Sequence, residues 1–203
     1  MGLILFGCNA NTKSKASLKP DAETANLHDS QKDKSEIQHL IREVLKWADS
    51  KNTIDLLPMI SQDSIYVGFD LDKLHQNIEK LKKSGFFADE FIDNYDQIIR
   101  TLDGKIKDGK FAKWNTGELP TFSFANDVSP WCLCQDNLSW DNIEVEIVNL
   151  NDDKGELKWS WGKLDAKVDP SWKAFSYKFR VVKVNGKWEI SYLQGFDYNE
   201  SIK

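Results

Sequence analysis

Two adjacent polar residues, Gln135 and Asp136, lie between two tryptophans, Trp131 and Trp140. An amide and a carboxylate beside aromatic rings can line the mouth of a pocket and orient a polar ligand. The same residues also have a structural interpretation, in which Asp136 caps a turn, Gln135 satisfies backbone groups and both tryptophans pack in the core. The residue types favour the structural interpretation, yet these four residues are the best ligand-binding candidates in the chain.

Cys132 and Cys134 fall inside the same stretch. If the stretch is a strand, residues two apart share a face but lie too far apart for easy disulfide geometry. The spacing also fails to match a zinc site, and the sequence holds no second ligand pair. We therefore expect two buried cysteines that act as small apolar residues, with no redox or metal role.

The remaining reactive residue types form no catalytic pattern. His28, His39 and His75 are scattered along the chain, so we expect neither a metal site nor a catalytic base among them. The sequence contains no nucleophile elbow, zinc-protease motif, phosphate loop or dinucleotide fingerprint. We expect no cofactor and no catalytic residue, because an enzyme that used Asp136 as acid or base would lack a second group.

Cys8 ends a short apolar run, Leu5-Phe6-Gly7-Cys8, in the manner of a bacterial lipoprotein signal. We expect lipid on Cys8 and an anchor on a bacterial membrane, with the protein facing the periplasm or the cell surface. Residues 1–8 are too short for a complete signal and carry no basic residue, so we expect the natural signal to begin upstream. The alternative is a buried N-terminal strand that happens to end in cysteine.

Residues 9–35 are polar and rich in Lys, Asp, Ser and Asn. Such a segment buries too little apolar surface to offset the entropy of ordering, so we expect a disordered tether between the lipid and the folded part. The folded part, 36–203, is long enough for one domain with a real core. The net charge of −5 and the absence of a basic stripe argue against a nucleic-acid partner.

Apolar periodicity and capping signals predict helices in the first half of the domain. One helix should begin at Ser35 and end near Ser50, and a short helix capped by Thr53 should run to Ile60. After an extended segment at 64–69, Asp70 should cap a helix that stops at Gly85. The last helix should span 86–102 and close at Gly104.

The second half alternates apolar and polar residues, which is typical of half-buried strands. These strands are expected at 143–147, 157–161, 175–181 and 188–192, with Asn185-Gly186 as the hairpin turn between the last two. Trp159 and Trp161 share one strand face; they could form an aromatic platform for a sugar, but a core face fits their spacing better. We expect an α+β fold in which N-terminal helices pack on a curved antiparallel sheet and form a cone with a possible pocket.

The stretch from Asp127 to Trp140 resembles the signature of a family of uncharacterised bacterial envelope lipoproteins. The matching positions are an acidic residue, an aromatic-Leu-x-small-Gln-Asp run and a tryptophan, here Asp127, Trp131, Leu133, Cys134, Gln135, Asp136 and Trp140. Residues 82–91 and 182–190 are also similar. The resemblance implies a cystatin-like, nuclear-transport-factor-type α+β roll and an envelope location. It transfers no chemistry, because the family has no established activity.

Three functions are compatible with these features. The first is a membrane-tethered, non-catalytic module that binds a small molecule or an envelope protein. The second is a periplasmic inhibitor or immunity protein, since an acidic surface can steer association with a basic toxin. The third is a small-molecule enzyme that uses the cone pocket. The sequence favours the first, because it assembles no catalytic set.

Overall fold

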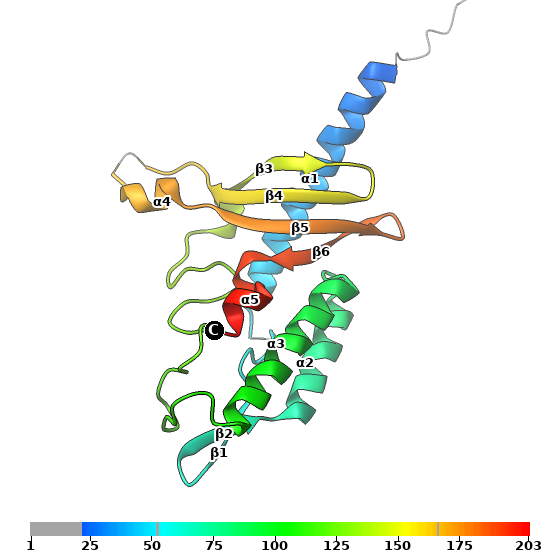
Figure 1. Cartoon of the computed structure of the whole chain (residues 1–203). Helices are drawn as coiled ribbons and strands as arrows, with labels where there is room; N and C mark the ends of the chain where they lie inside the picture. The colour runs from blue at the N-terminus through cyan, green and yellow to red at the C-terminus, as the bar shows by residue number, and fades with distance from the viewer. Residues whose placement is uncertain (1–21, 52, 166) are drawn as a thin grey trace, which may run out of the picture.

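The computed structural model describes residues 22–51, 53–165 and 167–203, and the expected signal and the first part of the expected tether lie outside them (Figure 1). The protein is a mixed α+β structure with helices and two antiparallel sheets. Its helices are α1 Ala22–Ala48, α2 Leu71–Ser84, α3 Asp89–Lys107, α4 Pro170–Ala174 and α5 Tyr198–Ser201, with 3-10 turns η1 Trp140–Asn142 and η2 Gln194–Phe196.

Helix α1 begins earlier than the sequence predicts, so the expected tether is wrong for its last part, 22–35. Ser35 lies inside the helix and does not cap it. Tertiary contacts stabilise the part of the extension around Asp33, whose carboxylate accepts hydrogen bonds from Trp188 Nε1 at 2.9 Å and from Lys183 Nζ at 3.1 Å. Helix propensity and apolar periodicity cannot predict such a polar contact with a distant strand.

Replacing Asp33 by Ala should lower the free energy of unfolding by about 1–2 kcal/mol, because it leaves the buried Trp188 indole and the half-buried Lys183 amine without their charged acceptor. A disordered residue at this position would show no effect. Urea denaturation measures the difference, with Gln31→Ala on the exposed face of the same helix as the control. Equal stability of the two variants would contradict this contact of Asp33.

Helix α2 has the ends that the sequence predicts. Asp70 accepts hydrogen bonds from the backbone of Asp72 and Lys73, and Gly85 adopts the left-handed conformation that ends the helix. Helix α3 starts later than expected, because the preceding residues pair with the sheet: Ala88 N donates to Ile190 O at 3.0 Å. It also continues through Gly104, which caps nothing.

The short helix expected at 53–60 is wrong. This part of the chain instead enters a two-stranded sheet of β1 Met59–Gln62 and β2 Ile65–Phe69. Asp63 and Ser64 form the turn with φ of 50° and 63°, the left-handed pair that suits a two-residue hairpin. Phe69 N donates to the buried Asp103 carboxylate at 2.9 Å and so ties the hairpin to α3.

The second half forms the four expected strands: β3 Ile143–Leu150, β4 Lys154–Trp161, β5 Tyr177–Val184 and β6 Lys187–Leu193. They make one antiparallel sheet in the order β3-β4-β5-β6. Asn185 and Gly186 turn the last hairpin with positive φ, as predicted. Strand β6 is not a free edge along its whole length, because Phe87 bridges to Ile190.

The core contains residues from both the sheet and the helices and is rich in aromatic rings. Trp159, Tyr177 and Phe179 of the sheet are buried, as are Ile41 and Leu45 of α1. In Figure 1, α1 passes behind the sheet, which it contacts at β3 and β6, while α2 and α3 lie as a pair below β6. No helix in 22–51, 53–165 or 167–203 combines the length and apolar character that crossing a membrane requires.

Candidate functional site: an aromatic pocket beside a disulfide turn

Gln135 and Asp136 are exposed and line a pocket with a volume of about 350 Å³. They come from the long loop that precedes η1. The pocket wall facing them is aromatic and comes from two other segments. Trp161 lies at the end of β4, Trp172 is on α4, and Phe175 follows α4. Gln135 and Asp136, which the sequence predicts at the mouth of a pocket, therefore do line a pocket.

Trp131 and Trp140, the other two candidates, lie in the core and do not line this pocket. Trp131 is 4% exposed, and its ring centroid is 4.6 Å from that of Phe196 and 5.8 Å from that of Phe87. Trp140 stacks on Trp161 with centroids 5.2 Å apart. The structural interpretation is therefore the correct one for both tryptophans.

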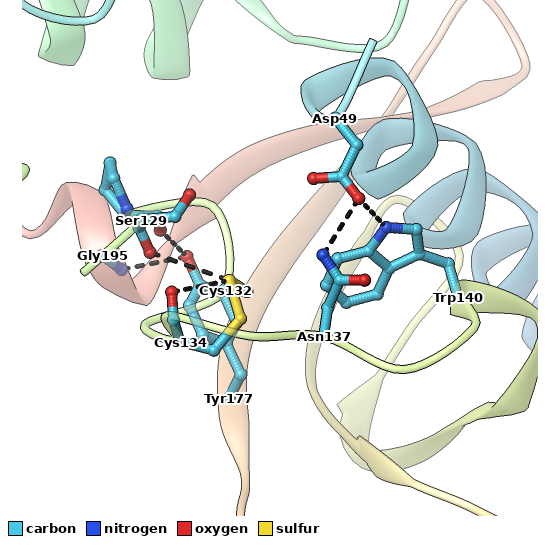
Figure 2. The surroundings of a disulfide bond; sticks show 9 residues. Asp49, Ser129, Cys132, Cys134, Asn137, Trp140, Tyr177 and Gly195 are labelled. Atoms are coloured by element: carbon cyan, nitrogen blue, oxygen red, sulfur yellow. Dashed lines mark hydrogen bonds between the residues drawn. A yellow bond between two sulfur atoms is a disulfide. The ribbon is translucent and has the colours of Figure 1, made fainter.

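Trp140 also fastens the pocket loop to the end of α1. Its indole Nε1 donates to Asp49 Oδ2, and Asn137 Nδ2 donates to the same oxygen at 3.1 Å (Figure 2). The Trp140 ring thus packs against Trp161, and the indole N–H of Trp140 fixes the loop through its hydrogen bond to Asp49. Its contribution to the pocket is one of support.

Cys132 and Cys134 form a disulfide, with Cα atoms 5.2 Å apart (Figure 2). The expectation of two unpaired cysteines is wrong, because the segment is a tight turn and not a strand. Ser129 N donates to Cys134 O at 3.1 Å, and Leu133 adopts a left-handed φ of 53°. This backbone reversal brings the two sulfurs together. We call residues 129–134 the disulfide turn.

Tyr177 anchors the disulfide turn to the sheet. Its hydroxyl donates to Pro130 O at 2.7 Å and accepts from Gly195 N at 3.0 Å, as Figure 2 shows for Gly195. Complete burial raises the pKa of Tyr177, so the hydroxyl stays protonated and able to donate. The turn is therefore held by a buried network that joins β5, η2 and the pocket loop.

Replacing Tyr177 by Phe should lower the free energy of unfolding by about 2 kcal/mol, because Pro130 O and Gly195 N lose their buried partner. Chemical denaturation measures this effect. Tyr192→Phe is the matched control, since among the described residues the Tyr192 hydroxyl bonds to the half-buried Asp197 carboxylate alone. A Tyr177→Phe loss no larger than that of the control would contradict the anchoring role.

Helix α4 positions Trp172, the residue that the sequence analysis missed. Asp169 caps the helix by accepting from Ser171 N at 2.8 Å, and this hydrogen bonding lowers the pKa of the Asp169 carboxyl. Pro170 follows at the first helical position. The Asp-Pro pair is a helix-start signal that could have revealed α4. The Trp172 ring then lies 5.6 Å from that of Trp161.

The two polar side chains of the rim, Gln135 and Asp136, differ in how firmly hydrogen bonds hold them. Gln135 Nε2 donates to Asp127 Oδ1 at 3.0 Å and to Asp127 O at 3.3 Å, so the side chain also satisfies a backbone carbonyl as the structural interpretation expects. Asp136 makes no hydrogen bond within the described residues and caps no turn there. The rim thus offers one fixed amide and one exposed carboxylate.

The rim residues and the aromatic wall are suited to binding a ligand. Within the described residues, no cluster of three His, Cys, Asp or Glu side chains could hold a metal ion. His39 and His75 are exposed on α1 and α2 and line no part of the pocket, and the side chain of His28 lies outside the described part. Trp159 is fully buried, so it belongs to the core and cannot serve as a sugar platform.

A larger cavity of about 640 Å³ lies between the β1–β2 hairpin and the end of α3. Tyr66, Phe111 and Trp114 line it, together with Lys107 and Lys113. Lys107 is already paired with Asp103 Oδ2 at 2.6 Å. None of the residues singled out in the sequence lies there, and size alone does not make a binding site. We therefore treat the pocket beside the disulfide turn as the candidate site.

The chain matches no protein-family model, and searches of curated proteins and of solved structures returned no match either. The lipoprotein family suggested by residues 127–140 therefore stays a prediction.

Proposed function

We propose that this protein is a binding module whose site, the pocket beside the disulfide turn, is itself non-catalytic. The observation that carries the proposal is the union of three aromatic side chains, Trp161, Trp172 and Phe175, with the rim residues Gln135 and Asp136 in one pocket. A few polar groups over an aromatic wall favour a polar ligand that has one flat apolar face. The rim carboxylate and the net charge of −5 favour a neutral or cationic ligand.

Trp172 is the residue that separates binding from folding. Replacing Trp172 by Ala should weaken ligand binding at least tenfold, because the wall loses a half-buried ring, while the unfolding midpoint in urea should change little. The ligands come from a thermal-shift screen of neutral sugars and aromatic amines. Affinity is then measured by isothermal titration calorimetry on the wild type and the variant.

The matched control is Trp47→Ala, which removes an indole that does not line the pocket. This variant should lose stability and keep the affinity of the folded fraction. Unchanged affinity in Trp172→Ala, for every ligand found, would overturn the assignment of the pocket.

We also propose that the module is held at the cell envelope by lipid on Cys8. A disulfide persists in oxidising compartments such as the periplasm or the cell surface, so the Cys132–Cys134 pair supports an exported protein. It also leaves Cys8 as the unpaired cysteine. Partners would then be the membrane, through the lipid, and a small molecule or an envelope protein, with no nucleic acid.

Metabolic labelling with an alkyne fatty acid tests the anchor in cells that express the full reading frame. Wild-type protein should carry the label and sediment with membranes, whereas Cys8→Ser should lose the label. Cys134→Ser is the control and should keep it. Labelling that survives in Cys8→Ser would refute the anchor.

The arrangement of the domain supports a finer proposal about the fold, a cystatin-like, nuclear-transport-factor-type roll. The helices precede an antiparallel meander, and α1 touches both β3 and β6. Arg42 of α1 donates to Ile143 O at 2.8 Å at one side of the sheet, and Asp33 binds Trp188 at the other. Such a roll would leave a pocket at one end of the sheet, where the candidate site lies.

A further inference from the structure

The disulfide contributes little as a structural staple. It joins cysteines only two positions apart, and the chain entropy that a cross-link removes from the unfolded state falls as the loop shortens. The buried network around Tyr177 already fixes the same turn without it. Because the disulfide contributes so little to stability, we look for a chemical role of the two cysteines.

The turn also holds Leu133 in an unfavourable conformation. Its φ of 53° is a left-handed value that disfavours residues with a side chain, and the side chain is 37% exposed. A disulfide that constrains strained backbone is a better oxidant than one in a relaxed loop, because opening it releases the strain.

The two sulfurs lie in different surroundings. Cys132 is 4% exposed, and its Sγ lies 3.9 Å from Ser129 O and 3.6 Å from Cys134 O. In the dithiol form a Cys132 thiol can donate a hydrogen bond to these carbonyls, which stabilises the reduced protein. Cys134 is half-buried and lines the pocket beside Gln135 and Asp136. An incoming thiolate can therefore approach Cys134 and not Cys132.

We propose that Cys132–Cys134 is a thiol-exchange site and that its substrate is a cysteine-containing polypeptide. The substrate thiolate attacks Cys134 Sγ, a substrate–Cys134 disulfide forms, and the Cys132–Cys134 bond breaks. Cys132 leaves as a thiolate and takes a proton from water. A second substrate thiolate then attacks the substrate sulfur of the mixed disulfide, the bond from that sulfur to Cys134 breaks, and Cys134 leaves as a thiolate that takes a proton from water. The substrate gains a disulfide, and the protein gains two electrons as a dithiol.

The aromatic wall gives this site its preference for a polypeptide. An apolar side chain next to the reacting cysteine can lie against Trp172 and Phe175 while the sulfur reaches Cys134. This step rests on the proposed pocket, whereas the exchange itself rests on the disulfide turn. Another disulfide-bearing molecule of the envelope returns the dithiol to the oxidised form by the same exchange.

Trapping with oxidised glutathione tests the assignment of the two sulfurs. Both variants are made in a Cys8→Ser background, so that the third cysteine of the chain cannot react. Cys132→Ser keeps a hydroxyl donor for Ser129 O and frees Cys134, so it should gain one glutathione at least tenfold faster than Cys134→Ser, as measured by mass spectrometry. Circular dichroism checks that both variants fold. Equal rates, or faster reaction of Cys134→Ser, would overturn the proposal.

Equilibration of the wild-type protein with reduced and oxidised glutathione tests the oxidising character. The folded protein should be reduced without denaturant, and Leu133→Gly should lower the equilibrium constant for reduction about tenfold, because glycine removes the left-handed penalty from the oxidised form. A disulfide that is reduced only in urea, or an unchanged constant in Leu133→Gly, would contradict the proposal.

A peptide carrying Phe beside Cys separates this inference from the proposed pocket. It should react with the wild-type disulfide faster than glutathione does, and Trp172→Ala should lower the ratio of the peptide rate to the glutathione rate to about one. If the wild-type disulfide reacts with glutathione but no faster with the peptide, the pocket and the polypeptide substrate are refuted, while the reactive disulfide is not. Failure of both reactions would refute the exchange itself.

Discussion

Replacing Trp131 by Ala is expected to lower the free energy of unfolding by about 3–5 kcal/mol. The Trp131 ring lies among Trp47, Phe87, Phe91 and Phe196, with centroid distances between 4.6 and 6.2 Å. Its removal leaves a cavity where segments from α1, α3 and η2 meet the disulfide turn, and packed rings around such a cavity relax only in part. Urea denaturation at constant pH measures the loss.

Trp131→Phe is the matched control, because it keeps an aromatic ring and should cost less than half as much. Trp131 was a ligand-binding candidate in the sequence, so the two interpretations make opposite predictions. A core residue loses stability on truncation, whereas a ligand residue loses affinity. Near wild-type stability of Trp131→Ala with lost binding would contradict the packing described above.

Replacing Gly195 by Ala should lower the free energy of unfolding by about 3 kcal/mol or prevent a native disulfide turn. A Cβ on Gly195 would lie 2.0 Å from Pro130 O, which is a backbone atom of the disulfide turn and cannot rotate away. Insertion of even one methyl group into a tightly packed site commonly costs about 1–3 kcal/mol, and a backbone contact this close lies at the upper end. The Tyr177 hydroxyl, which binds both residues, would be displaced as well.

Gly104→Ala is the control for this variant, because a Cβ at Gly104 meets no atom within 4 Å. Gly104 lies inside α3, where alanine is favoured over glycine by about 1 kcal/mol, so this variant should be more stable than the wild type. Thermal denaturation distinguishes the two. Equal melting temperatures for Gly195→Ala and the wild type would show that η2 does not pack against Pro130.

The sequence predicted elements best where local chemistry decides them. Asp70 and Gly85 mark the ends of α2, and Asn185-Gly186 marks the β5–β6 turn, because each residue satisfies its own backbone requirement. The errors arise where distant contacts prevail. Asp33 extends α1 through bonds to β6, and pairing of Phe87 with Ile190 delays the start of α3.

The site was predictable only for its polar half. Gln135 and Asp136 stand out as neighbours in the sequence, but the aromatic wall comes from residues 161–175 and meets them only through folding. The disulfide was missed because a strand geometry was assumed for Cys132 and Cys134. The left-handed Leu133 that makes the bond possible has no sequence signal, since leucine is not a residue that favours positive φ.

Titration of the tryptophan indole N–H signals by NMR tests the central claim, that the pocket beside the disulfide turn binds ligand. Neutral sugars and aromatic amines that bind should shift the Trp161 and Trp172 signals first. The Trp188 signal should stay fixed, because its indole is bonded to Asp33. Shifts that gather on Trp114, in the larger cavity of about 640 Å³, would contradict the assignment of the site.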